Sequence, residues 1–181
     1  MSRLLILAPL AIVCLLSGCA SVPLASMLKL ASLGTDGLAA IEPLQLRVRL
    51  SVSPGYEIDV GNARLRLSLP EGEGRSRETE LSLDLMERSI INRSAGLFRG
   101  SVATPTYLLR LTPGSANELA ALKARLATKS GGKRGFSVNA PFSKIPSNAE
   151  TVSFWADLRL ATDADWIALI DGAKLKIRKK E

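Results

Sequence analysis

Residues 44–53, LQLRVRLSVS, are the stretch of sequence that decides the fold. Through all ten positions an apolar residue alternates with a polar one: Leu44, Leu46, Val48, Leu50 and Val52 against Gln45, Arg47, Arg49, Ser51 and Ser53. Because successive side chains of a β-strand point to opposite faces, this pattern predicts a strand with one buried and one exposed face. We expect its leucines and valines to line a hydrophobic core.

The same alternation recurs further along the chain. It is clearest in residues 63–69 (ARLRLSL), 80–86 (ELSLDLM) and 151–160 (TVSFWADLRL). Less regular segments with β character lie at 56–60, 96–102, 106–111, 136–139, 166–170 and 173–178. Turn-forming residues separate these segments, at Pro54-Gly55, Gly61-Asn62, the predicted loop 70–74, Pro113-Gly114 and the hairpin-type pair Asp171-Gly172.

One helix is predicted among these strands. Residues 115–118 (SANE) fit a capping box, in which the Ser hydroxyl and the Glu carboxylate bond to free backbone N–H groups. Leu119, Leu122 and Leu126 follow at helical spacing. Since parallel α/β folds need several crossover helices, the single helix argues against them. The sequence therefore predicts a mainly β fold, an antiparallel β-sandwich or a small barrel, with one α-helix around 116–128.

The N-terminal segment has a different composition. Arg3 is its only charge. Residues 4–16 form an apolar run of 13 residues, and the small residues Ser17, Gly18 and Cys19 follow it. A membrane-spanning helix needs about 20 apolar residues, so this run is too short to be one. A positive start, a short apolar core and small residues at its end are typical of a secretory signal peptide.

Leu16-Ser17-Gly18-Cys19 resembles the lipobox of bacterial lipoproteins, which consists of an aliphatic residue, a small residue, Gly or Ala, and Cys. The resemblance implies cleavage before Cys19, a diacylglycerol thioether on its sulfur and an acyl chain on its new amino group. Several acyl chains together anchor a protein durably to a bilayer. Ala20 and Ser21 follow, where an Asp would retain a lipoprotein at the inner membrane, so the resemblance implies the periplasmic leaflet of the outer membrane. No family resemblance extends to the remaining chain.

These observations divide the chain into three parts. They are a signal peptide at 1–18, a lipidated N-terminus with an apolar tether at 19–43, and a single β-rich domain at 44–181. The tether is too apolar for a solvated linker. It either lies on the bilayer or docks on its own domain, and docking is favoured because Lys29 is its only basic residue.

Composition excludes several chemistries. The chain has no histidine, and its two cysteines are Cys14, within the signal peptide, and Cys19. Ser-His-Asp and Cys-His catalysis and metal sites built from His or Cys are therefore ruled out, and we expect no cofactor and no metal. The net charge is +7, or +6 without Arg3 (23 basic against 17 acidic residues). Only 4% of residues are aromatic, which argues against nucleic-acid binding.

Three short patterns are similar to elements of penicillin-binding proteins and β-lactamases. They are S-x-x-K at Ser26–Lys29, S-x-N at Ser137–Asn139 and an approximate K-T-G at Lys129–Gly131. Their order along the chain is wrong, and the first lies in the tether. A Ser-Lys hydrolase is thus only a remote alternative, and we expect no enzyme.

Three groups of residues are candidate contact sites. The outward arginines of the first strands form a basic face, or they pair across strands with Glu78, Glu80 or Asp84. The basic C-terminus contacts an anionic membrane surface, or it is a solvated end that protects an edge strand. Trp155 is predicted on the outer face, as a partner contact or covered by the helix or tether. The residues concerned are Arg47, Arg49, Arg64 and Arg66 on the strands and Lys174, Lys176, Arg178, Lys179 and Lys180 at the C-terminus.

Together these features predict a lipid-anchored, non-enzymatic protein of the outer membrane. The leading hypothesis is an accessory subunit that binds another envelope protein. The alternative is a carrier or sensor of a lipid or other apolar ligand, held in a cavity between sheets. A cavity lined by Leu and Val would favour the alternative, and a close-packed core would argue against it.

Overall fold

The computed structural model describes residues 41–72, 75–94, 100–126 and 135–177. In these ranges the chain is mainly β, with one α-helix and one short 3-10 helix. The elements in chain order are β1 (Arg47–Val52), β2 (Glu57–Ile58), η1 (Val60–Asn62), β3 (Arg64–Gly72), β4 (Arg75–Ser94), β5 (Ser101–Leu111), α3 (Pro113–Leu126), β6 (Gly135–Asn139), β7 (Phe142–Lys144), β8 (Thr151–Arg159) and β9 (Ile167–Lys176).

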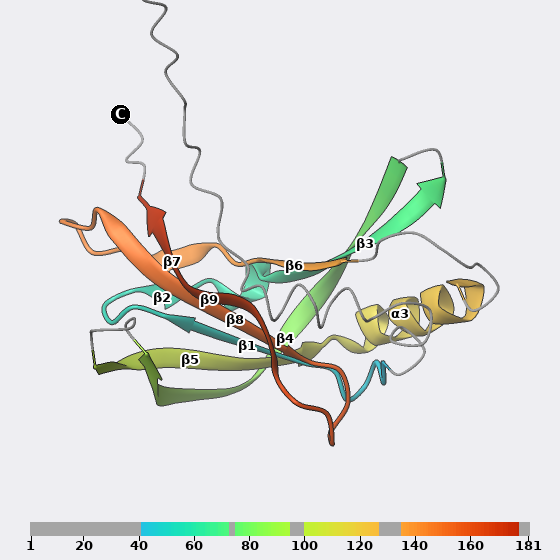
Figure 1. The fold of residues 1–181 in the computed structure, drawn as a ribbon, viewed down its shortest axis with the longest axis horizontal. Coiled ribbons are helices and arrows are strands. Elements are labelled where there is room, and N and C mark those ends of the chain that lie inside the picture. Colours follow the sequence, from blue (N-terminus) through green and yellow to red (C-terminus); the bar gives the residue numbers. More distant parts are fainter. Residues whose placement is uncertain (1–40, 73–74, 95–99, 127–134, 178–181) are drawn as a thin grey trace, which may run out of the picture.

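Seven strands form one antiparallel sheet in the order β6-β3-β4-β5-β1-β8-β9, which curls until it is nearly closed into a barrel (Figure 1). Strands β2 and β7 pair with each other in a small second sheet. The predicted fold class, antiparallel β with one helix, is confirmed in its barrel form. No helix within the described ranges is long and apolar enough to span a membrane.

Strand β1 lies between β5 and β8. Its alternation places Leu46, Val48 and Leu50 inside the barrel, each without exposed surface. The predicted burial of Leu44 is wrong, because residues 43–45 form a turn and the Leu44 side chain is 76% exposed. The strand is therefore shorter than its sequence pattern, but the pattern's register is correct.

Strand β4 is much longer than predicted. Residues 70–72 of the predicted loop 70–74 belong to β3, and the mostly charged residues 75–78 that follow the loop belong to β4 and pair with β3. The first part of β4 pairs with β3 and the second part with β5, with a register shift between Leu85 and Glu87. Because the strand bulges there, Leu85 is 39% exposed, although the sequence pattern predicted its burial.

Helix α3 begins at Pro113, three residues earlier than predicted, and is described as far as Leu126. The predicted capping box is wrong, since Thr112 caps the helix and its Oγ1 accepts a hydrogen bond of 3.2 Å from the Ser115 N–H. The Ser115 hydroxyl instead accepts a hydrogen bond of 2.8 Å from the Ser82 N–H of β4. This bond ties the helix to the sheet.

Strand β9 runs without a break through Asp171 and Gly172, where the sequence predicted a hairpin turn. Gly172 has φ +64°, and the pairing of β8 with β9 shifts register nearby. A glycine in this left-handed conformation is typical of a β-bulge. The dipeptide therefore bends one strand instead of joining two.

One cluster of apolar side chains fills the barrel. It includes Ile41, only 1% exposed, whose carbonyl oxygen accepts a hydrogen bond from Lys123 Nζ of α3. This residue at the end of the predicted tether therefore packs on the domain. Residues 19–40 of the tether lie outside the described ranges.

Candidate functional site

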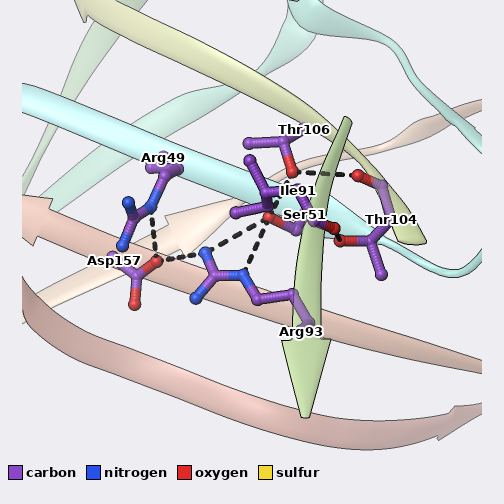
Figure 2. Close-up of polar contacts among 7 residues, drawn as sticks. All are labelled: Arg49, Ser51, Ile91, Arg93, Thr104, Thr106 and Asp157. Atoms are coloured by element: carbon purple, nitrogen blue, oxygen red, sulfur yellow. Dashed lines mark hydrogen bonds and ion pairs between the residues drawn. The ribbon is translucent and has the colours of Figure 1, made fainter. Parts of the chain in front are cut away.

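The outer face of the sheet carries a cluster of polar side chains that are largely buried. Asp157 of β8 is 5% exposed, Thr106 of β5 is 3% exposed, and Ser51 of β1 and Thr104 of β5 have no exposed surface. Arg93, near the end of β4, reaches across β1 toward Asp157 (Figure 2). We call this set the polar cluster, with the members Arg49, Ser51, Arg93, Thr104, Thr106 and Asp157.

Asp157 forms the charged part of the polar cluster. Its Oδ2 accepts a hydrogen bond of 2.9 Å from Arg49 Nε and another from Arg93 Nη2. The side chains of Arg49 and Arg93 keep 27% and 14% of their exposed surface, against 6% for Asp157. One carboxylate thus joins β1, β4 and β8 through two guanidinium groups.

The donor and the acceptor can be assigned in each hydrogen bond that the hydroxyl groups of the polar cluster form. Thr104 Oγ1 donates to the Ile91 carbonyl oxygen at 3.0 Å, and Thr106 Oγ1 donates to the Thr104 carbonyl oxygen at 3.2 Å. A hydroxyl has one proton, so Ser51 must be the donor in its 2.8 Å bond with Thr106. Arg93 in turn donates to Ser51 Oγ. Every hydroxyl proton is committed, so the cluster joins strands and offers no free nucleophile.

Beside the polar cluster lie three arginines from adjacent strands. Arg47 of β1 is the register partner of Arg110 on β5 and of Arg159 on β8. We call these three residues the arginine row. None of them forms an ion pair with a carboxylate among the described residues. Burial, and then the charges of Arg159 and Arg110, lower the pKa of Arg47 below its usual value.

Trp166, which precedes β9, orders the arginines at this end of the sheet. The Arg49 guanidinium carbon lies 4.3 Å from the centroid of the Trp166 ring, and that of Arg159 lies 4.9 Å away. Both distances are within the range of cation–π attraction. The Nε atom of Arg159 is buried and has no hydrogen-bond partner among the residues that the structure describes.

The four arginines singled out in the sequence do not form one basic face. Arg47 and Arg49 lie on β1, whereas Arg64 and Arg66 lie on β3, with β4 and β5 between the two strands. Arg66 pairs across strands with Glu80 at 2.6 Å, as the pairing alternative predicted. Arg49 pairs with Asp157, a partner that sequence reasoning missed. Arg64 donates to the carbonyl oxygens of Gly61 and Ala63.

Trp155 occupies the outer face of β8, but its side chain is only 2% exposed. It lies under Gly172 of β9, where an added Cβ would be 3.2 Å from Trp155 Nε1. The alternative of an exposed contact residue is therefore wrong, and the favoured alternative, a covered Trp155, is correct except for the element that covers it. The neighbouring strand covers Trp155, where the sequence suggested the helix or the tether.

Several predicted sites lie partly or wholly outside the described ranges. Lys174 and Lys176 are exposed on β9, but Arg178, Lys179 and Lys180 are not described. The lipobox residues 16–19, with Cys19, are also outside. Ser137 and Asn139 belong to β6, whereas the S-x-x-K and K-T-G-like elements at 26–29 and 129–131 are not described. These predictions stay predictions.

An open groove of about 450 Å³ lies among β2, β4, β5 and β7. Its walls combine apolar and charged groups, including Tyr56, Ile90, Tyr107, Arg88 and Lys144. The Arg88 guanidinium carbon lies 5.4 Å from the centroid of the Tyr107 ring. This groove is not the Leu- and Val-lined cavity that the carrier hypothesis requires.

The described residues contain no group of three or more His, Cys, Asp or Glu side chains that could hold a metal ion. No protein-family model, curated protein or solved structure gives a significant match to the chain.

Proposed function

We propose that this chain is an outer-membrane lipoprotein whose β-barrel domain acts as a non-enzymatic binding subunit of an envelope assembly. The observation that carries the proposal is Leu16-Ser17-Gly18-Cys19, directly after a short apolar run with a single positive charge before it. Lipid on Cys19 would hold the domain at the periplasmic leaflet.

Exposed apolar side chains on β4 support a role in protein binding. Leu85, Met86 and Ile90 expose 39%, 44% and 74% of their surface, and Ile90 lies at the wall of the groove. Tyr56 and Tyr107 line the same groove but are largely buried, with 6% and 3% of their surface exposed. Several exposed apolar side chains on one strand are typical of a surface that binds another protein.

The chemistry of the buried polar groups supports a role without catalysis. The sequence offers no histidine as a general base, and the polar cluster uses its hydroxyl protons in hydrogen bonds between strands. A serine nucleophile needs a base within hydrogen-bond reach, whereas Ser51 receives its hydrogen bonds from the Arg93 guanidinium. The hydrogen bonds of the polar cluster therefore suit a role in holding the strands of the barrel together.

The anchor is tested by Cys19→Ser, with Cys14→Ser as the matched control. Both variants replace a cysteine near the N-terminus, but only the first removes the proposed lipid attachment site. We expect the Cys14→Ser chain to fractionate with outer membranes like the wild type, and the Cys19→Ser chain to leave them. A Cys19→Ser chain that is retained in outer membranes contradicts the proposal.

The binding role is tested by photo-crosslinking in intact cells. A photoreactive amino acid at Ile90 is compared with one at Leu44, which is equally exposed but lies in the turn before β1. We expect a discrete protein adduct from position 90 and none from position 44. The same adducts from both positions, or none from either, would contradict a specific partner at the groove.

A further inference from the structure

We propose that the arginine row, Arg110, Arg47 and Arg159, binds a phosphate group on the outer face of the barrel. The three residues are Cα partners on the adjacent strands β5, β1 and β8. Side chains that stand directly opposite across strands leave the sheet about 5 Å apart. The three arginine side chains therefore leave the sheet side by side, from one small area of its outer face.

Like charges placed directly opposite destabilise a sheet unless a counter-charge joins them. The carboxylate nearest in sequence, Asp157, is already bound by Arg49 and Arg93. Asp84 of β4 is the register partner of Arg110 at the end of the row, but it forms no ion pair with it. Among the described residues, the row therefore has three positive charges and no paired carboxylate.

The row also has unused donors. A guanidinium has five N–H groups. Within the described ranges Arg47 donates through Nη1 only, to the carbonyl oxygens of Leu44 and Leu46 at 2.7 and 2.9 Å. The Nε of Arg159 is buried without a partner in the described part of the chain, and burying an unsatisfied donor is costly. A bound anion would supply the missing acceptors.

Trp166 orders one member of the row, Arg159, before any ligand binds. Its ring lies under the guanidinium group of Arg159, so this side chain loses little rotational freedom on binding. The lowered pKa of Arg47, caused by burial and by its two arginine neighbours, indicates the same excess of positive charge. An anion would relieve this repulsion.

The number of donors favours phosphate over carboxylate. A carboxylate has two oxygens and is satisfied by one guanidinium fork, whereas phosphate offers three or more acceptors in a tetrahedral arrangement. Three guanidinium groups can thus share one phosphate. The group could belong to a soluble phosphate compound or to the headgroup of an anionic lipid. The inference does not depend on the anchor at Cys19.

The test is a titration of the purified full chain, in non-ionic detergent, with inorganic phosphate. Binding is measured by calorimetry and by the NMR signals of the arginine Nε–H groups. We expect Arg47→Gln to weaken phosphate binding about tenfold or more, since it removes charge-assisted hydrogen bonds. Arg66→Gln is the matched control, because Arg66 is an outward strand arginine already paired with Glu80. It should leave the affinity unchanged.

If Arg47→Gln does not fold, Arg110→Gln replaces it, because Arg110 is exposed. Acetate at the same ionic strength should bind much more weakly than phosphate. Equal binding of acetate and phosphate, or equal losses in the row variant and in Arg66→Gln, would overturn the proposal. So would the absence of a phosphate-dependent shift at the Arg159 Nε–H signal.

The source of the phosphate is distinguished with the full chain in lipid nanodiscs. Discs of phosphatidylcholine are compared with discs that also contain phosphatidylglycerol. A shift of the Arg159 Nε–H signal in phosphatidylglycerol discs without added phosphate supports the lipid headgroup. A shift only after inorganic phosphate is added supports a soluble ligand, and no shift in either case refutes phosphate binding.

Discussion

Replacing Asp157 with Asn tests whether the polar cluster holds the outer face of the barrel together. The change keeps the size of the side chain but removes the negative charge that Arg49 and Arg93 both contact. It leaves two guanidinium groups without their counter-charge, next to the three positive charges of the arginine row. We therefore expect a clear loss of stability.

The size of the loss follows from burial. Removing one partner of a buried ion pair costs about 3–5 kcal/mol. The Arg49 and Arg93 side chains keep 27% and 14% of their exposed surface, so water can partly solvate them once the carboxylate is gone. We therefore expect the free energy of unfolding to fall by about 2–3 kcal/mol, and Tm by roughly 5–12 °C.

The matched control is Glu80→Gln, which makes the same chemical change in the Arg66–Glu80 pair. The side chains of that pair are 38% and 50% exposed, so the pair is worth about 1 kcal/mol or less. Both variants are unfolded in urea and followed by far-UV circular dichroism. If Asp157→Asn costs no more than Glu80→Gln, the polar cluster does not stabilise the barrel as described.

Three further changes test individual features of the fold, each by the same urea titration. Gly172→Ala should cost about 1–3 kcal/mol, because the residue has φ +64° and its Cβ would press on Trp155. Gly135→Ala should be nearly neutral, because no atom of the described residues lies within 4 Å of its Cβ. Equal effects of the two variants would argue against the bulge over Trp155. Thr112→Ala should cost about 1 kcal/mol through loss of the helix cap, and a neutral result would show that another residue caps α3. Leu46→Ala should cost about 2–5 kcal/mol and Leu44→Ala less than about 0.5 kcal/mol, and the reverse order would place β1 in a different register.

The fold class was predictable because it depends on local alternation. In residues 46–53 and 63–69 the polar and apolar positions alone identify the inner and outer faces of β1 and β3. The helix was also predictable, but its cap was misplaced. Thr112 followed by Pro113 is itself a good start signal, since Thr suits the cap and Pro the first helical position.

The bulges were not predictable in the same way. At Gly172 the sequence shows a dipeptide that is equally suited to a turn, and only the packing of Trp155 against the neighbouring strand selects the bulge. At Leu85 the alternation continues, but the pairing of β4 with β5 shifts register between Leu85 and Glu87. Both outcomes depend on contacts between distant segments, which local patterns do not contain.

The candidate site was the least predictable part. Arg49 and Asp157 are 108 residues apart in the sequence, and Arg47 meets Arg110 and Arg159 only through strand pairing. A signal for the row does exist. Each of its arginines directly precedes an inward Val or Leu, at Val48, Leu111 and Leu160, so each occupies an outer position of its segment. Without the strand order, however, nothing in the sequence brings the three together.

The most direct test of the proposed function is the intact mass of the chain purified from cell membranes, with fragmentation of its N-terminus. We predict an N-terminus at Cys19 that carries a diacylglycerol group on its sulfur and an acyl chain on its amino group. A chain that begins elsewhere, or whose Cys19 is unmodified, would contradict the lipoprotein anchor on which the proposed function rests.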